Sequence, residues 1–232
     1  CLSILSELEE AEAQTKEYTQ KPKGNLKLNV PVTFGRLYII PYLVKFMETY
    51  PDISVDINFL DRKVDLLAEG FDLVIRIGHL QDSNLVARKL GKSPRIIVAS
   101  PDYLIQHGKP QTLTELKQHN CLLYTHLATV NIWHFSHKKK HMSIQVSGSM
   151  QSNSSDAVRE CLLSGLGIAV MPNWLIQPDL DAGRLVAVMG DYIPTELPIC
   201  AVYPQNNYIP LKVRCFIKFM KEMYSNNPLI NT

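Results

Sequence analysis

The sequence predicts an α/β fold. Between residues 26 and 224, short strand-like apolar runs alternate with helix-like patterns, and several of the helix patterns begin at a capping residue. This alternation is typical of helices packed on a largely parallel sheet. A chain of 232 residues is long enough for one large or two small domains with a substantial apolar core. We therefore expect two α/β units that are joined twice.

A helix is expected over residues 1–20, which contain no Gly or Pro. Its apolar side alternates at spacings of three and four, as in a coiled-coil seam. The seam residues are Cys1, Ile4, Leu8, Ala11, Thr15 and Tyr18. Because Ala11 and Thr15 are weak seam residues, a helix packed on its own domain is the alternative. Pro22 and Gly24 then end the helix in a linker.

The first unit is expected to open with a strand at Leu26–Val32, followed by a helix that ends before Pro51. Pro41 lies inside the helix pattern, so the helix either begins near residue 37 or is kinked at Pro41. The side chains expected on its buried face are Leu37, Ile40, Leu43, Val44 and Met47. Strands at Ile53–Phe59 and Leu73–Ile77 follow, with a short helix at Val64–Glu69 between them.

The second unit is expected to begin at Ser100, because Ser-Pro-Asp is a typical helix start. A short helix is expected at Thr112–Gln118, and a hairpin turns at His137–Lys140. The expected strands are Cys121–Thr125, Asn131–Phe135, Ser143–Ser147, Ile168–Met171 and Pro198–Tyr203. Two further helices are expected, from the Asn153–Asp156 cap to Gly165 and over Leu211–Tyr224.

Composition and charge exclude several classes of protein. Hydrophobic residues make up 46% and charged residues 20% of the chain, which excludes wholesale disorder. The formal net charge is +2, whereas an autonomous binder of duplex DNA normally has a strongly basic face. We therefore expect that the chain does not itself bind DNA.

The sequence also predicts a cytoplasmic protein. Five cysteines, an odd number without a CxxC motif, fit a reducing compartment. No apolar stretch approaches the roughly 18 residues of a membrane span. Acidic residues, beginning with Glu7, replace the basic and apolar regions of a signal peptide. The chain begins with Cys1, inside the expected helix, so we expect a segment upstream of it.

The strong enzyme motifs are absent from the sequence. It contains no G-x-G-x-x-G, P-loop, G-x-S-x-G or H-E-x-x-H pattern, so we expect no enzyme activity and no cofactor. His134, His137 and His141 have metal-like spacings, but on a hairpin they point to opposite faces, which favours a solvated basic turn. Leu122 beside Cys121 favours a buried thiol over a catalytic nucleophile.

Three strands are expected to run directly into capped helix starts, at Thr33, Ser100 and Ser154. Helix starts present backbone amides to small anions, although each residue would serve equally well as a plain cap. In open α/β sheets, ligands bind outside the carboxyl ends of strands. The three starts together therefore predict a binding cleft. Arg76 needs a partner if it is buried, either a ligand or a carboxylate such as Asp61 or Asp72.

Several motifs occur in the order typical of one family. They include Gly24–Leu28, Asp61–Leu66, Glu69–Gly78, Leu85–Arg88, Ser100–Leu104, Gly165–Pro172 and Gly183–Val186. On these motifs, residues 24–224 resemble the LysR-type transcriptional regulators. Residues 1–20 resemble the end of the family's linker helix, and the winged helix-turn-helix that precedes it is not in this chain.

The resemblance implies two Rossmann-like subdomains joined by two crossover strands, as in periplasmic binding proteins, after a linker helix. The crossovers are expected near Val98–Ser100 and Ala201–Tyr203. Subdomain I is then expected to comprise residues 24–99 and 204–224, and subdomain II residues 100–203. The rival reading is a solute-binding protein of the same two-lobed fold.

The resemblance also implies a small effector, which we expect to be anionic, in the cleft between the subdomains. The expected effector-binding residues are Thr33, Phe34, Leu60, Asp61, Arg76, Ser100, Thr125, His126, Asn153, Ser154 and Tyr203. Further expected partners are a second or several further copies, in a homodimer or homotetramer, and promoter DNA through the N-terminal domain. Residues 53–59 and the helix at 155–164 are the expected interface elements.

Overall fold

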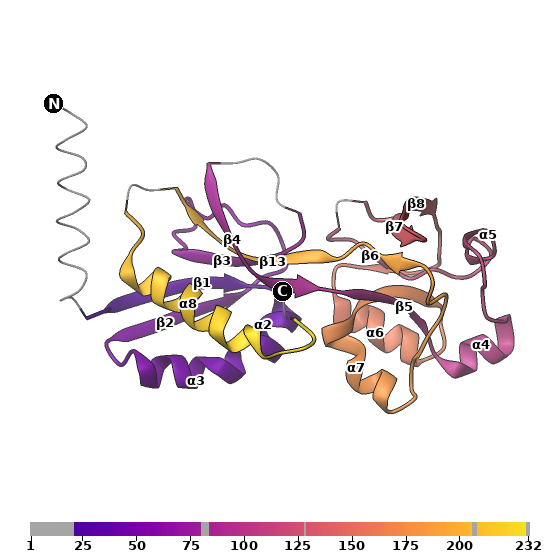
Figure 1. The fold of residues 1–232 in the computed structure, drawn as a ribbon, viewed down its shortest axis with the longest axis horizontal. Helices are drawn as coiled ribbons and strands as arrows, with labels where there is room; N and C mark the ends of the chain where they lie inside the picture. Colours follow the sequence, from indigo (N-terminus) through magenta and orange to yellow (C-terminus); the bar gives the residue numbers. More distant parts are fainter. Residues whose placement is uncertain (1–20, 80–83, 128, 206–207, 231–232) are drawn as a thin grey trace.

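The computed structural model describes residues 21–79, 84–127, 129–205 and 208–230. Two lobes, each with strands and helices, lie side by side and are connected by extended segments of the chain (Figure 1). The two-lobed α/β fold predicted from the sequence is confirmed. The expected helix over residues 1–20 lies outside the described residues.

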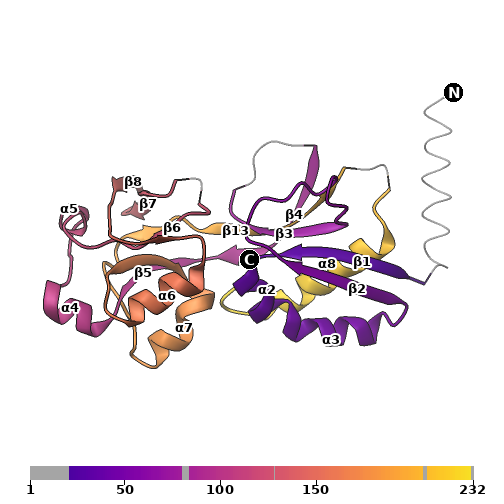
Figure 2. The ribbon, with the colours of Figure 1, turned by 180° about the vertical axis from the view of Figure 1, so that it is seen from behind.

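The sheet of the first lobe has the strand order β2-β1-β3-β13-β4. Its strands are β1 (Gly24–Val30), β2 (Ile53–Phe59), β3 (Leu73–Ile77), β4 (Leu85–Ser93) and β13 (Leu197–Pro204). β1 is parallel to β2 and β3, whereas β13 is antiparallel to β3 and β4. One face is covered by α2 (Val32–Tyr38), α3 (Ile40–Thr49) and α8 (Leu211–Ser225) (Figure 2).

The second lobe is built from smaller sheets. These are β10 (Ile168–Pro172), β5 (Arg95–Ala99) and β11 (Val186–Ala187); β12 (Ile193–Pro194), β7 (Ile132–His137) and β8 (Lys140–Gln145); and β6 (Leu123–Tyr124) with β9 (Gln151–Ser152). Its helices are α4 (Pro101–His107), α5 (Leu113–Leu116), α6 (Ser155–Leu163) and α7 (Asn173–Asp181). Among the helices described in both lobes, none is long and apolar enough to cross a membrane.

The strand pairing differs from the predicted ranges at both crossovers. β4 continues through Pro94 into β5, which pairs with β10 in the second lobe. The return crossover lies between β12 and β13, and Leu197–Pro204 pairs entirely within the first sheet. Residues 95–99 therefore lie in the second lobe and residues 197–203 in the first. Each crossover continues from one strand into the next across only Pro94 or residues 195–196, so the sequence pattern does not mark the change of sheet.

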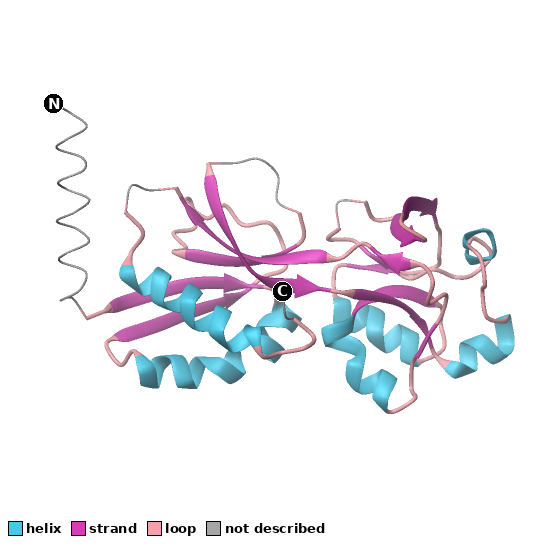
Figure 3. Cartoon of the chain, in the orientation of Figure 1, coloured by secondary structure: helices cyan, strands magenta, loops and turns pink. Residues whose placement is uncertain are grey.

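Two local predictions were wrong. The segment Val64–Glu69 contains a single turn in place of a helix (Figure 3). The Asp65 carboxylate caps this turn by accepting hydrogen bonds from the Leu67 and Ala68 amides at 3.1 and 3.0 Å. Gly70, with a φ of 68°, ends it. On α3, Val44 is 65% exposed, and Ile40 and Met47 are also exposed rather than buried.

Pro41 decides how the first helix pattern is divided. α2 ends at Tyr38, Ile39 separates the helices, and Pro41 lies in the first turn of α3. Proline is tolerated there because the first amides of a helix have no partner within it. The chain thus forms two helices at this point.

An aromatic seam joins the two lobes. Trp174 of α7 packs against the rings of Phe34 and Tyr38 of α2, with centroids 5.2 and 5.7 Å apart. The Tyr38 hydroxyl donates to the Trp174 carbonyl at 2.9 Å, and the Trp174 indole donates to the Ser93 hydroxyl at 2.8 Å. Residues of both lobes consequently share one hydrophobic core.

The residues after α8 pack on strand β4. Ile230 is fully buried, and its carbonyl accepts a hydrogen bond from the Lys92 amide at 2.9 Å. A side chain at Gly91 would place its Cβ 2.6 Å from Ile230. The absence of a side chain at Gly91 therefore allows this tail to lie directly against the strand that leads into the first crossover.

A buried ion pair fixes α6 against α7. Asp179 is fully buried and accepts hydrogen bonds from Arg159 at 2.5 and 2.7 Å and from Arg184 at 2.6 and 2.9 Å. Burial alone would raise the pKa of Asp179, but the hydrogen bonds and charges of the two arginines outweigh it and hold the pKa below its usual value. The carboxylate is therefore charged in the folded protein.

We expect Asp179→Asn to destabilise the domain by about 3 kcal/mol at neutral pH, because it leaves arginines without their buried partner. Since the folded-state pKa of Asp179 is depressed, its contribution is complete above the unfolded value of about 3.9 and is lost as pH falls through the folded-state pKa. The difference between wild type and variant should therefore shrink below about pH 4. Urea unfolding across pH measures it.

Asp181→Asn is the matched control for this prediction. Asp181 lies on the same helix but is exposed, and its carboxylate accepts from Gln177 at 2.7 Å. We expect this variant to change the free energy of unfolding by less than about 0.5 kcal/mol. Equal losses at the two positions would contradict the interpretation of Asp179.

Candidate functional site

A cleft of about 920 Å³ lies between the lobes. In the first lobe it is lined by residues that follow parallel strands, such as Pro31 after β1 and Gly78 after β3. In the second lobe it is lined by Thr125 after β6 and by Pro172 at the end of β10. The carboxyl ends of strands from both lobes thus converge on one cavity, as expected for a ligand site in α/β folds.

The structure brings together six of the predicted site residues at this cleft. They are Thr33, Phe34, Asp61, Arg76, Thr125 and His126. Four of them come from the first lobe, and Thr125 and His126 come from the second. A ligand in the cavity would therefore contact both lobes.

Ser100 and Tyr203 lie outside the lining of the cleft. β5 begins at the cleft and runs away from it, so Ser100 at its far end caps α4 by accepting from the Tyr103 amide at 3.4 Å. Tyr203 pairs with Val86, and its hydroxyl accepts from Arg88 at 3.3 Å. Its side chain lies on the opposite face of the strand from that of Val202, which lines the cleft. Strand direction explains the position of Ser100, and side-chain alternation explains that of Tyr203.

Three other predicted residues adjoin the cleft without lining it. The Leu60 amide donates to the Val30 carbonyl at 3.0 Å and extends the pairing of β2 with β1. Asn153 is exposed, and the Ser154 hydroxyl accepts from the Ala157 amide at 3.3 Å as the cap of α6. The next residue, Ser155, lines the cavity instead.

Thr33 connects the two lobes across the floor of the cleft. Its hydroxyl donates to the Asp156 carboxylate at 2.5 Å and accepts from the Ser155 hydroxyl at 3.2 Å. Arg36 adds a longer ion pair with Asp156, at 3.7 Å. The Val32 amide at the start of the same helix donates to Asp61 at 3.0 Å. The Val32 amide and the Thr33 hydroxyl at this helix start are thus already bonded within the protein.

Among the charged side chains that line the cleft, the cations outnumber the carboxylates. Arg76 and Arg95 lie there with Lys63, whereas Asp61 is a carboxylate whose charge also acts on Arg76. Burial lowers the pKa of Arg76, the Asp61 charge raises it, and its guanidinium donates to the Arg62 carbonyl at 2.9 Å. Asp72, the other carboxylate considered for Arg76, pairs with Lys212 at 2.7 Å. The cleft is therefore suited to an anion.

The remaining lining is largely apolar and aromatic. Phe34 and Trp174 belong to the seam between the lobes, and Trp133 and Tyr124 face the cavity from the second lobe. Burial is the main cause that raises the pKa of Tyr124, and the nearby charge of Asp61 adds to it. Tyr124 is therefore a neutral phenol. A ligand with an anionic group and an apolar body fits these surroundings.

Sequence reasoning missed Arg95, Tyr124, Ser155 and both tryptophans as cleft residues. A signal was available for Arg95, which opens the apolar strand Arg95–Ala99 as a lone charge, just as Arg76 lies within Leu73–Ile77. The tryptophans gave no such signal, because an apolar side chain at a cleft and one in a core have the same sequence pattern.

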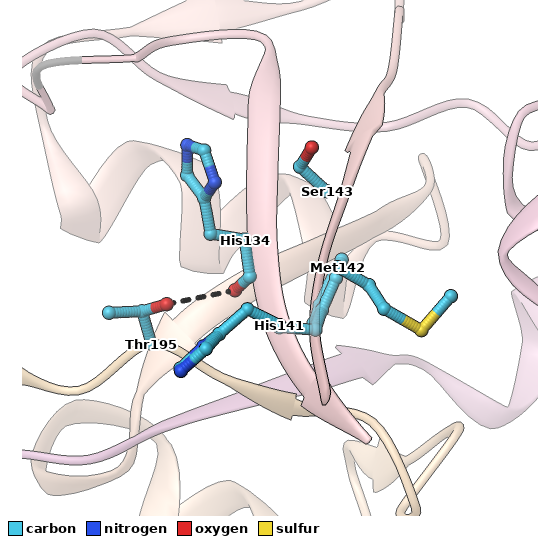
Figure 4. A pocket seen from close by; sticks show the side chains of 6 residues that line it. His134, His141, Met142, Ser143 and Thr195 are labelled. Atoms are coloured by element: carbon cyan, nitrogen blue, oxygen red, sulfur yellow. Dashed lines mark hydrogen bonds between the residues drawn. The ribbon is translucent and has the colours of Figure 1, made fainter. Parts of the chain in front are cut away.

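A second hollow of about 340 Å³ lies at the β7–β8 hairpin (Figure 4), and His134 and Thr195 line both this hollow and the cleft. His134 and His141 project from neighbouring strands, and Thr195 donates to the His134 carbonyl at 3.3 Å. His137 lies apart from them and stacks on Tyr192, with centroids 4.5 Å apart. Within the described residues, no three His, Cys, Asp or Glu side chains gather to hold a metal ion.

Two of the described cysteines do not have the properties of activated nucleophiles. Cys121 is fully buried, and burial raises the pKa of its thiol to about 12. Burial likewise raises the pKa of Cys200. A catalytic thiol needs the opposite shift, because the thiolate is the reactive form.

Residues 19–225 match the family model described as the LysR substrate binding domain. The chain belongs to the LysR family. It is the effector-sensing part of a transcriptional regulator, and the LysR resemblance drawn from the sequence is confirmed.

Curated LysR-family relatives support this assignment. An uncharacterized HTH-type transcriptional regulator of Haemophilus influenzae is 37% identical over 92% of this chain and 74% of its own length. The HTH-type transcriptional activator TtdR of Escherichia coli is 32% identical over 94% of this chain and 71% of its own length. LysR-type regulators bind small-molecule effectors and DNA and act as multimers.

Solved LysR-family structures share the fold. CrgA of Neisseria meningitidis has a TM-score of 0.77 at 29% identity and covers 96% of this chain and 76% of its own. Full-length AphB of Vibrio cholerae has a TM-score of 0.74 at 28% identity, with coverage of 96% and 76%.

We expect Thr33→Val and Asp156→Asn to be energetically coupled, because their side chains form one hydrogen bond between the lobes of this LysR domain. A bond to a charged acceptor predicts a coupling free energy of about 1.5 kcal/mol. Urea unfolding of wild type, both single variants and the double variant measures it.

Thr49→Val is the control for this cycle. The substitution is chemically the same, but Thr49 lies on α3, and its hydroxyl donates to the Lys45 carbonyl of the same helix at 2.7 Å. It should show no coupling to Asp156→Asn. Additive effects of Thr33→Val and Asp156→Asn would show that the bond does not link the lobes.

Proposed function

We propose that this domain binds a small anionic metabolite in the cleft between its lobes and that this binding controls transcription. The observation that carries the proposal is the cleft lining, which combines side chains of both lobes and in which Arg76 and Arg95 supply positive charge. A carboxylate or another oxyanion is the natural partner of an arginine. The effector therefore carries at least one such group.

The proposed mechanism is a shift between two arrangements of the lobes. A ligand changes this equilibrium only through its differential affinity for the two states, and inverting a 1:99 population needs about 5.5 kcal/mol of such preference. The Thr33–Asp156 bond and the aromatic seam hold the lobes in the arrangement described above. An effector that binds to both lobes changes the relative stability of the two arrangements through this bond and this seam.

The response reaches DNA through a part that is not in this chain. We propose that the full protein carries an N-terminal winged helix-turn-helix, and that the expected helix at residues 1–20 pairs two subunits. The effector then changes the spacing of the paired DNA-binding domains on the promoter. We place the protein in the cytoplasm, where such regulators meet both metabolite and DNA.

We further propose that the domain contributes to a homodimer or a homotetramer. β2 is the edge strand of the first sheet, and with α6 it is an expected interface element. On α3 the residues Ile40, Val44 and Met47 form an exposed apolar stripe. Exposed apolar stripes of this kind are typical of interfaces between proteins.

We propose that the domain has no enzymatic activity. The relatives named above are transcriptional regulators, and the thiols of Cys121 and Cys200 are held in their protonated form. The family model and the regulator relatives favour this reading over a solute-binding protein of the same two-lobed fold.

We expect Val44→Asp to weaken self-association of the domain about ten-fold or more, because it places a charge in the apolar stripe of α3. Sedimentation velocity over a range of concentrations measures the association. Ile105→Asp is the control, since Ile105 is 81% exposed on α4 of the other lobe. An unchanged association constant in Val44→Asp would exclude α3 from the interface.

We expect a screen of small carboxylates to find compounds that raise the melting temperature by about 5 to 10 °C at a concentration of 100 times Kd. The amide of each carboxylate tests the requirement for charge. Arg76→Met should weaken binding of the hits, whereas Arg88→Met, outside the cleft lining, should not. Equal stabilisation by the amides would refute an anionic effector.

A further inference from the structure

Arg95 occupies the first crossover between the lobes. It follows Pro94 as the first residue of β5, and it pairs in register with Pro172 of β10. Its side chain lines the cleft together with that of Ser93 on the other side of Pro94. The guanidinium is therefore fixed to the point at which the chain passes from one lobe to the other.

The same side chain is bonded to the second crossover. The Nε group of Arg95 donates to the Thr195 carbonyl at 2.8 Å, and Thr195 lies between β12 and β13. The Thr195 amide in turn donates to the His134 carbonyl of β7 at 2.9 Å. Arg95 thus links the two segments about which the lobes must move.

The protein supplies no counter-charge for Arg95 among the residues that the structure describes. Glu196, which follows its hydrogen-bond acceptor, pairs with Lys92 at 3.6 Å instead. Burial alone lowers the pKa of Arg95 to about 10, and no carboxylate acts in the other direction. By contrast, the half-buried Arg159 is held by Asp179.

The orientation of the guanidinium leaves a defined position for an anion. With Nε bonded to Thr195, the Nη groups of Arg95 make no hydrogen bond to any described residue. An oxyanion bound to these groups would satisfy donors and neutralise a charge that burial disfavours. Trp133 and Trp174, which line the same cleft, provide apolar surfaces for the rest of such a ligand.

We propose that Arg95 binds the oxyanion group of the effector through its Nη groups while Nε keeps its bond to Thr195. This inference rests on the proposed function and assigns the charged end of the ligand to the junction of the two crossovers. Arg95 then both binds the ligand in the cleft and holds the two crossovers between the lobes together. A carboxylate on an apolar body is the ligand class that this position selects.

The test uses the two tryptophans of the chain, Trp133 and Trp174, as reporters, because both line the cleft. Iodide is an anionic quencher that collects near an unpaired cation, and acrylamide is a neutral one. We expect iodide quenching to fall about two-fold or more in both Arg95→Met and Arg95→Gln, with acrylamide quenching unchanged. Arg95→Lys, which keeps the charge, should retain the iodide response.

Phenylacetate and its neutral amide are the second pair of probes. Phenylacetate should protect the wild-type tryptophans from iodide, and phenylacetamide should not. In Arg95→Lys this protection should weaken, because lysine lacks the two-donor fork. Arg88→Met is the matched control and should behave as wild type. Circular dichroism of each variant verifies that the fold is retained.

The outcomes separate this inference from the proposed function. One outcome is that Arg76→Met loses the iodide preference while Arg95→Met and Arg95→Gln behave as wild type. This result would overturn the role of Arg95 but would leave the proposal of an anion-binding cleft intact. Equal quenching by iodide and by caesium in the wild type would show that the cleft does not attract anions, and the proposed function would fail with it. If Arg95→Met does not fold, the comparison of Arg95→Gln with Arg95→Lys decides.

Discussion

The pairing of β13 with both β3 and β4 is the interaction on which the rest of the structure depends. It returns the chain to the first sheet after the second lobe is complete, and it places Leu197 opposite Ser93. The two crossovers are consequently held side by side at the end of one sheet. The cleft, the aromatic seam and the position of Arg95 all follow from that arrangement.

Two kinds of contact hold the lobes together, and they respond differently to a ligand. The Trp174 seam is apolar and packed, so a change in it exposes large rings to water. The contacts of Thr33 and Arg95 are a few hydrogen bonds of residues that line the cavity, so they exchange partners more readily. The seam provides a permanent connection, and the polar contacts provide the part that can be switched.

Sequence pattern predicted the elements whose determinants are local. The strand at Ile53–Phe59 follows from strict alternation, and the cap of α4 follows from a serine before a proline. The helix expected at Val64–Glu69 is reduced to a single turn, which the Asp65 side chain caps and Gly70 ends with a φ of 68°. The candidate site was predictable where a strand of known direction ends, as at Thr33. It was not predictable at Ser100, because the direction of β5 depends on its antiparallel partner β10.

The burial of Ile230 determines where the C-terminal boundary of this domain should be placed. The match to the family model ends at residue 225, yet Ile230 covers Gly91 and bonds to Lys92 on the strand that enters the first crossover. A recombinant domain cut at the end of the match would expose that strand and lose a buried side chain. Recombinant domains should therefore extend through Ile230, and a C-terminal tag needs a spacer that leaves its packing intact.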